Sequence, residues 1–236
     1  MLNIIDLGEK WGFPVGRIFD PWKAITLPCD TLSFLKEHSS KIDLVCFGGG
    51  HDIHPSLYGH RNVSTDCGDS PSNRDLWEIG AWEICRDNKI PVLGICRGAQ
   101  FVCAMSGGSL IQDIGGGHGK KGHILKTDSG EDVAMTSTHH QLMWPRKTKH
   151  KLIAWLEGNG DNWLYDHKRL GDLREETKEP EIVFFPETIS LAVQGHPEYY
   201  RDLECRSVSY IRELVGEYLF PDNSRRLYRG QNGTHL

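Results

Sequence analysis

The amino-acid sequence predicts an α/β protein, a three-layer sandwich in which helices cover both faces of a mainly parallel central sheet with some antiparallel extension. Through the first hundred residues, short apolar runs alternate with segments of helical period, as in a parallel sheet covered on both faces. Beyond residue 120, strand-like runs follow one another and indicate hairpins. Because 236 residues can form one sizeable core and no linker divides them, we predict a single domain over residues 1–220. A polar tail, 221–236, should be loosely ordered.

The first half of the chain supplies the alternating elements. Residues 2–6 predict a strand, 32–38 a short helix and 42–47 a buried strand that ends in three glycines. The stretch 8–30 is rich in glycine, proline and tryptophan and shows no period, so no element is assigned to it. A helix is expected over 74–88, capped by Asn73 or Ser72. Its core-facing residues should be Leu76, Ile79, Trp82 and Ile84.

The second half supplies the strands of the extension and one long helix. Apolar residues at three- and four-residue steps predict a last helix over 201–219. The strand-like runs are 124–125, 133–135, 152–155, 182–185 and 189–194.

Composition excludes several classes of function. The net charge of −5 favours neither a nucleic-acid surface nor a membrane surface, and no apolar run is long enough to span a bilayer. The seven cysteines are odd in number and form no C-x-x-C pair, which predicts a reducing, cytoplasmic location rather than a disulfide scaffold. The first residues lack the pattern of a signal peptide.

One cysteine lies at a turn suited to a nucleophile. Residues 91–95 form an apolar strand, Cys96 follows between Gly94 and Gly98, and a helical pattern then begins. This is the order of a nucleophile elbow, in which glycines permit a tight, strained turn. The helix N-terminus also favours the thiolate form of the cysteine. The local pattern alone fits a buried structural cysteine equally well.

Two further motifs complement this cysteine. Gly48, Gly49 and Gly50 end the strand at 42–47 and can present N–H groups to an oxyanion, although a flexible turn has the same pattern. His196 follows the apolar strand at 189–194, and Glu198 lies two residues later. The carboxylate could orient the imidazole toward the thiol, whereas a surface loop would explain a lone His-x-Glu. With the elbow cysteine, these motifs favour catalysis.

These residues resemble the class I glutamine amidotransferase superfamily. The resemblance rests on residues 94–100 (GICRGAQ) with 195–198 (GHPE). Residues 49–59 are similar to the signature of its γ-glutamyl hydrolase-like branch, which includes γ-glutamyl-γ-aminobutyrate hydrolases. Weaker matches are Arg74-Asp75, 107–110 and 137–141. The resemblance covers about residues 42–200 and implies a flavodoxin-like sandwich.

The resemblance also implies the chemistry and its residues. A triad of Cys96, His196 and Glu198 would attack the side-chain amide of a γ-glutamyl group and form a glutamyl thioester, and water would then release glutamate. Backbone N–H groups of Arg97 and of Gly49 or Gly50 would hold the oxyanion. The substrate-binding residues that the resemblance implies are Gln100, His139, His140 and Gln141.

Two features modify this expectation. The Asn-Ser that the family has before its two histidines is replaced by residues 136–138, Thr-Ser-Thr, so a substrate contact changes. Histidines at 51, 54, 118 and 123 suggest metal binding, but no cysteine or carboxylate in the sequence pattern completes a ligand set. Adjacent His139 and His140 should point to opposite faces of a strand and not share an ion. We therefore predict no metal and no cofactor.

Three functions remain open from the sequence. The first is a stand-alone hydrolase of glutamine or a γ-glutamyl-amine. The second is a glutaminase subunit that delivers ammonia to a synthase partner in trans, since the chain has no P-loop or second catalytic domain. The third is a binding module without activity, which an intact triad disfavours. The sequence predicts a small-molecule γ-glutamyl substrate and leaves a homodimer open.

Overall fold

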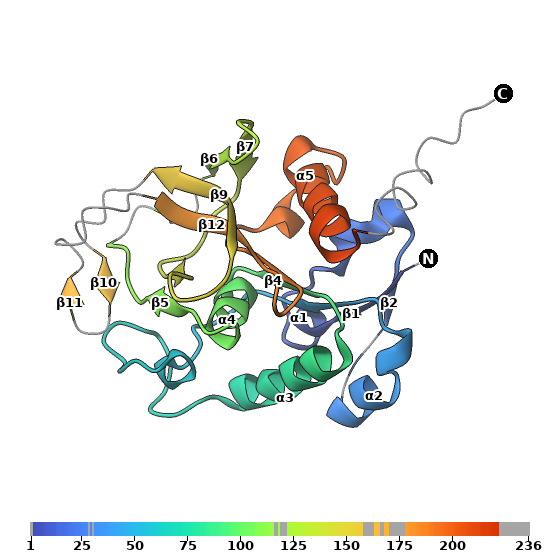
Figure 1. Cartoon of the computed structure of the whole chain (residues 1–236), viewed down its shortest axis with the longest axis horizontal. Helices are drawn as coiled ribbons and strands as arrows, with labels where there is room; N and C mark the ends of the chain where they lie inside the picture. Colours follow the sequence, from blue (N-terminus) through green and yellow to red (C-terminus); the bar gives the residue numbers. More distant parts are fainter. Residues whose placement is uncertain are drawn as a thin grey trace.

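A nine-stranded sheet runs through the part of the chain that the structure describes. The computed structural model describes residues 2–27, 29, 31–115, 118, 122–157, 163–165, 168–169 and 178–221. The strand order is β2-β1-β3-β4-β13-β12-β9-β6-β7 (Figure 1). The predicted α/β sandwich with a mixed sheet is confirmed.

Five strands are parallel and form the centre of the sandwich. β3, β4 and β13 are buried at every position, as expected for strands covered on both faces. The five strands are β2 (Ile25–Leu27), β1 (Asn3–Asp6), β3 (Leu44–Phe47), β4 (Val92–Ile95) and β13 (Ser190–Val193).

Four antiparallel strands extend the sheet, as the run of strand patterns predicts. Buried and exposed residues alternate along β7, so one of its faces is solvated. The four are β12 (Lys178–Phe185), β9 (Lys151–Glu157), β6 (His123–Thr127) and β7 (Asp132–Met135). Two small antiparallel sheets of two strands each lie beside them, namely β5 (Ser109–Ile111) with β8 (Leu142–Trp144) and β10 (Leu164–Tyr165) with β11 (Lys168–Arg169).

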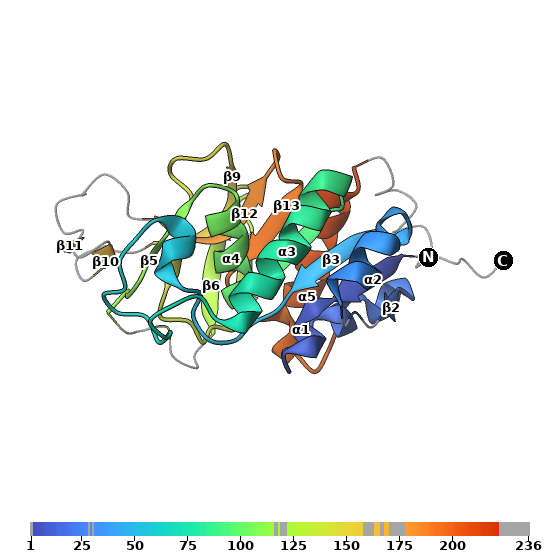
Figure 2. The ribbon, with the colours of Figure 1, turned by 90° about the horizontal axis from the view of Figure 1, so that it is seen from below.

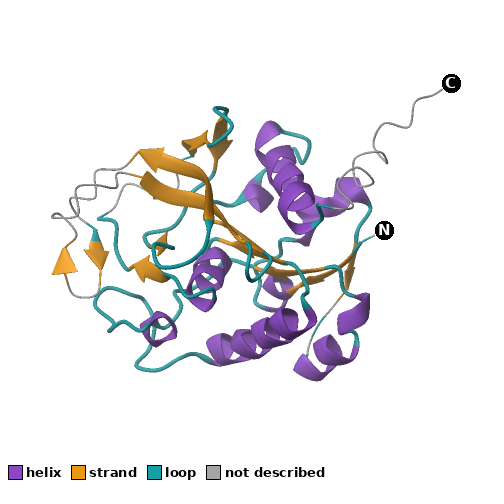
Figure 3. Cartoon of the chain, viewed as in Figure 1, coloured by secondary structure: helices purple, strands orange, loops and turns teal. Residues whose placement is uncertain are grey.

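Helices cover both faces of the sheet (Figures 2 and 3). On one face lie α2 (Leu32–Glu37), α3 (Asn73–Asn88) and α4 (Arg97–Met105), packed around one apolar core. The other face carries α5 (Arg206–Leu214), the π-helical turn Val215–Leu219 and the 3₁₀ helix Gly16–Trp22, packed around a second core. Shorter helical segments are α1 (Leu7–Lys10), Ser39–Lys41, Pro55–Tyr58 and Pro197–Tyr199.

The helix α3 begins at its predicted cap, and three of its four predicted core-facing residues, Ile79, Trp82 and Ile84, pack on the core. Ser72 and Asp75 form a capping box, in which each side chain accepts a hydrogen bond from the other's backbone N–H. Leu76 is 58% exposed, whereas Asp75 and Glu78 are buried. The prediction was wrong for Leu76 alone, because Asp75 and Glu78 occupy the inner positions beside it and form buried ion pairs.

Other differences from the sequence prediction are local. The stretch 8–30 contains a 3₁₀ helix and the edge strand β2, which pairs with β1. The last helix begins at Arg206 rather than at residue 201. Residues 222–236, most of the predicted tail, lie outside the described residues. No described helix has the length and apolarity that crossing a membrane requires.

The C-terminal ends of β3, β4 and β13 meet at one edge of the parallel half. Phe47 of β3 is opposite Gly94 of β4, and Val193 of β13 is opposite Ile95 of β4. The glycine run, Cys96 and His196 follow these ends directly. Ligands of open α/β sheets bind at such strand ends.

Candidate active site

Cys96 lies at a strained turn between β4 and α4. Its φ of 52° and ψ of −109° are rare for a residue with a side chain. A Cβ on Gly94 would lie 2.5 Å from the Gly98 carbonyl oxygen, and one on Gly98 would lie 2.0 Å from the Phe47 oxygen. Only glycines allow these approaches, so the structure has the predicted nucleophile elbow.

His196 and Glu198 form a buried pair at the end of β13. Nδ1 of His196 lies 2.7 Å from Oε1 of Glu198, and the 3₁₀ turn Pro197–Tyr199 directs the carboxylate back toward the ring. Both residues are buried. The ring of Tyr199 stacks on the imidazole with centroids 4.2 Å apart and planes 4° from parallel. These contacts restrict the rotation of the imidazole.

The surroundings of His196 favour its protonated form. Burial lowers the pKa of His196, but hydrogen bonds and charges from Cys96 and Glu198 outweigh it and raise the pKa to about 10. A carboxylate on one ring nitrogen and a thiol beside the other are the arrangement that stabilises an imidazolium.

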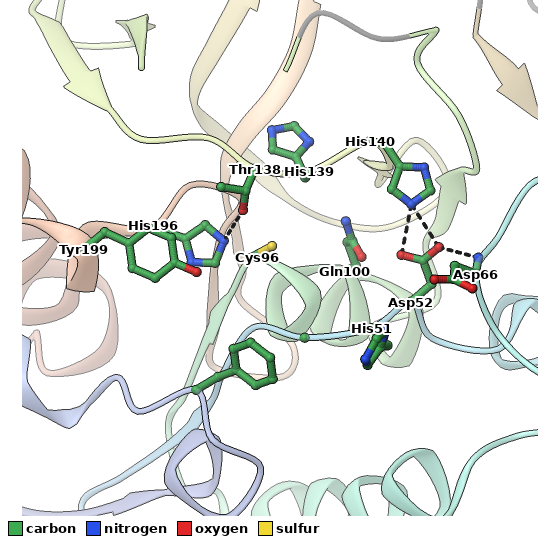
Figure 4. A pocket seen from close by; sticks show the side chains of 12 residues that line it. His51, Asp52, Asp66, Cys96, Gln100, Thr138, His139, His140, His196 and Tyr199 are labelled. Atoms are coloured by element: carbon green, nitrogen blue, oxygen red, sulfur yellow. Dashed lines mark hydrogen bonds and ion pairs between the residues drawn. The ribbon is translucent and has the colours of Figure 1, made fainter. Parts of the chain in front are cut away.

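Residues 136–138, where the sequence departs from the family pattern, hold His196. The Thr136 hydroxyl donates a 2.6 Å hydrogen bond to the His196 carbonyl, and the His196 N–H donates to the Thr136 carbonyl at 3.2 Å. Thr138 Oγ1 lies 2.9 Å from His196 Nε2, beside the Cys96 sulfur (Figure 4). This segment thus fixes the histidine rather than serving only as a substrate contact.

Arg74 orients the glycine run. Its Nη1 donates to the Gly49 carbonyl at 2.8 Å and its Nη2 donates to the Gly48 carbonyl at 3.0 Å. In a trans peptide the next N–H points opposite to the carbonyl, so the Gly50 N–H is directed away from Arg74. Gly50 lines the cavity at Cys96, and a Cβ on Gly49 would lie 3.1 Å from His196 Cε1. Both predicted glycines therefore border the reactive groups.

The side chain of Arg97 turns away from the cavity into a buried ion cluster. It pairs with Asp75 and Glu78, and Glu78 also accepts from Arg74 Nε at 2.8 Å. Arg97, Asp75 and Glu78 are nearly inaccessible. The cluster joins α3 to the first turn of α4, where the backbone N–H of Arg97 has no intrahelical partner.

A cavity of about 260 Å³ opens above Cys96 and His196 (Figure 4). The predicted residues Gln100, His139 and His140 line it, but Gln141 does not. Gln141 is fully buried, and its carbonyl accepts hydrogen bonds from His139 Nδ1 at 2.8 Å and Gln100 Nε2 at 3.4 Å. Its assignment as a substrate-binding side chain was wrong, because it supports the wall from behind.

His139 and His140 point apart, as predicted. Nε2 of His140 lies 3.0 Å from Asp52 Oδ2 at the cavity, and the hydrogen bond that His140 donates to that carboxylate raises the pKa of His140. His139 turns its Nε2 toward the buried carboxylate of Glu181, 3.3 Å away. Neither nitrogen of His139 is therefore directed into the cavity.

Several residues of the site were missed from the sequence. Thr138, Asp52, Arg74 and Tyr199 lie in quoted motifs or beside them, but the spacing does not show that they contact the catalytic groups. Phe13 lines the cavity from the stretch without a period, and no sequence signal indicates it. His118 and His123 lie close to His139. The buried carboxylate of Glu181, which the sequence pattern did not indicate, lies 3.3 Å from His139 Nε2.

The fold is that of the class I glutamine amidotransferases, enzymes that act on C–N amide bonds. The chain belongs to the Peptidase C26 family, whose model matches residues 23–157.

Relatives and solved structures agree with this assignment. The chain is 34% identical to protein NtpR of Enterococcus hirae over 195 residues, 81% of this chain and 75% of that protein. It is 43% identical to the gamma-glutamyl-CDP-amidate hydrolase of Campylobacter jejuni over 98 residues, 42% of each. A glutamine amidotransferase structure from Thermotoga maritima has a TM-score of 0.53 at 15% identity, covering 98% of this chain and 91% of that one, and supports the fold.

Proposed function

We propose that the protein hydrolyses the amide of a γ-glutamyl group through a thioester on Cys96. The observation that supports it most directly is the convergence of Cys96, the buried His196–Glu198 pair and the Gly49–Gly50 backbone at one cavity. These are the nucleophile, oriented base and oxyanion donors that acyl transfer requires.

The steps use these groups in order. The Cys96 thiolate attacks the amide carbon, and N–H groups of Gly50 and Arg97 stabilise the tetrahedral oxyanion. The His196 imidazolium donates its proton to the leaving nitrogen, which departs as ammonia or an amine and leaves the thioester. Neutral His196 then takes a proton from the water that attacks the thioester carbon, the C–S bond breaks, and glutamate is released with the Cys96 thiolate and the His196 imidazolium restored.

Space for a leaving group extends beyond the catalytic cavity. A neighbouring cavity of about 380 Å³ is lined by Trp11, Phe13 and Arg74 and shares His51 and Asp52 with the first. An amine larger than ammonia could leave by this route. We therefore include γ-glutamyl-CDP-amidate, the compound after which the Campylobacter relative is named, among the compounds to test.

Glutamate release from a panel of compounds tests the proposal. The purified protein is incubated with glutamine, γ-glutamyl-amines and γ-glutamyl-CDP-amidate, each beside a Cys96→Ala control. Release from an amine or amidate by the protein alone supports the hydrolase. Weak release from glutamine that rises when a synthase partner is added favours the amidotransferase subunit. Absence of Cys96-dependent release from every compound contradicts both and favours a binding module.

A further inference from the structure

Three histidines converge behind the cavity wall. His118 precedes β6, His123 begins β6 and His139 follows β7. One ring nitrogen from each lies within 4.8 Å of the other two. The ring centroid of His118 is 4.7 Å from that of His123 and 5.0 Å from that of His139. Three segments of the extension thus bring three ligand-type atoms to one point.

The hydrogen bonding of His139 leaves a lone pair at this point. Its Nδ1 lies 2.8 Å from the Gln141 carbonyl, which only accepts, so Nδ1 carries the proton. In the neutral ring, Nε2 then faces Glu181 Oε1 at 3.3 Å with a lone pair against a carboxylate oxygen. A cation between them removes this repulsion. Donation of the other ring N–H to a backbone carbonyl is typical of metal-bound histidines.

Two buried carboxylates border the cluster. Glu181 is fully buried, and neither of its oxygens has a hydrogen-bond donor among the described residues. Oε2 of Glu179 lies 2.8 Å from His118 Nε2. Buried charges are ordinarily paired or bound to a metal ion. Nδ1 of His118 and Nε2 of His123 are buried and form no hydrogen bond with the described residues.

We propose that His118, His123 and His139 bind a divalent ion of the zinc type, and that Glu181, 3.3 Å from His139 Nε2, moves in as the fourth ligand. Three imidazoles and one carboxylate form a tetrahedral donor set that suits this class of ion. Ligand nitrogens around such an ion are about 3.3 Å apart, given bond lengths of about 2.0–2.1 Å. The cluster contracts from its 4.8 Å spread on binding. All four ligands come from the protein, so the site is structural.

The ion would act on the catalytic cavity through its wall. His139 lines that cavity and directly follows Thr138, which contacts His196. Binding at His139 and Glu181 would join residues 138–140 to β6 and β12. The ion therefore positions the segment that holds His196 and takes no part in the bond cleavage.

Metal binding to the apoprotein tests this site without any assay of activity. Zinc affinity is measured by calorimetry, and cobalt is added to obtain the visible spectrum of a tetrahedral site. All proteins carry Cys96→Ala, so that the nucleophile does not bind the ion and the result is independent of the proposed hydrolysis. We expect one ion per chain and a tetrahedral cobalt spectrum.

Variants locate the ion. His123→Ala and Glu181→Gln should each lower the zinc affinity by more than about 100-fold, because even outer-sphere partners contribute about 10–100-fold. His38→Ala, at the C-cap of α2, is the matched control and should leave the zinc affinity unchanged. Circular dichroism verifies that each variant is folded. Less than one ion per chain, or equal affinity in the His123 variant and its control, overturns the proposal and leaves the histidines as packed, proton-sharing groups.

Discussion

The positive φ of Cys96 depends on its glycine neighbours. Gly94 and Gly98 let the strand, the turn and the following helix approach within distances that no Cβ permits. The same dependence on glycine holds at Gly50, whose φ is +133° and whose added Cβ would lie 2.4 Å from Arg74 Nη1. The geometry of the nucleophile and of the proposed oxyanion donor thus depends on the backbone more than on polar side chains.

Gly50→Ala tests the proposed oxyanion donor. The added methyl group displaces Arg74 and strains the backbone, so the Gly50 N–H leaves its position. We expect kcat for glutamate release to fall by about 10²–10³-fold, the effect of losing one such donor. Gly68→Ala is the control, because an added Cβ there would lie 4.0 Å from the carbonyl oxygen of Ser70. Equal activity of the two variants would show that Gly50 does not hold the oxyanion.

The raised pKa of His196 predicts the alkaline limit of activity. A histidine with a pKa of about 10 keeps its proton through neutral pH and loses it as the pH rises through 10. Since the proposed mechanism needs that proton for the leaving group, kcat/KM should fall there, with an apparent value that belongs to the coupled Cys96–His196 pair. Glu198→Gln removes one cause of the rise, so the limit should move to lower pH. Superimposable pH profiles of the two proteins would contradict this.

At the scale of residues, the sequence predicted the groups that lie in short motifs. Cys96, His196 and Glu198 are identified by their immediate neighbours, and the structure brings the last two within 2.7 Å. Thr138 and Phe13 reach the site only through tertiary packing, and nothing in their local spacing indicates it. Gln141 was misassigned because its motif shows proximity to the cavity but not the direction of the side chain.

At the scale of elements, α3 packs through charge as well as through apolar surface. Asp75 and Glu78 occupy inner positions of the helix and pair with Arg97, while Leu76 faces outward. A repeat of apolar residues does not predict that Asp75 and Glu78 face inward, because both carboxylates are stabilised by Arg97, which is far away in the sequence. The helix therefore holds the first turn of α4 through ion pairs.

Glu78→Gln tests this attachment. Its carboxylate forms ion pairs with both Arg74 and Arg97. Loss of the negative charge therefore leaves buried positive charge without compensation. We expect the free energy of unfolding, measured with urea, to fall by about 3 kcal/mol. Glu83→Gln, at an exposed position of the same helix, should change it by less than about 0.5 kcal/mol. Similar losses in both variants would show that the cluster adds no specific stability.

At the scale of the whole molecule, the parallel and antiparallel halves share one sheet and their cores. The first core joins Ile5 and Leu35 of the N-terminal half to Val183 and Phe185 of β12. The alternation of patterns along the sequence predicted this mixed sheet. It did not predict the edge strand β2, since three residues in a stretch rich in glycine and proline carry no distinct period.

Cooperative unfolding tests the predicted single domain. Because β4, β13 and β12 are adjacent strands of one sheet, neither the parallel nor the antiparallel half of that sheet should unfold alone. Urea unfolding followed by far-ultraviolet circular dichroism and by tryptophan fluorescence should give the same midpoint and slope. Two separated transitions would instead divide the chain into independently folding units.

The pairing of β13 with β4 also has a consequence for the order of events during synthesis. The nucleophile at residue 96 leaves the ribosome about 100 residues before its base at residue 196, and β13 must insert between β4 and β12 before the two meet. A nascent or truncated chain therefore carries a thiol without its proton donor. Under the proposed mechanism the chain becomes reactive only when β13 has closed the sheet, so catalytic activity requires the completed fold.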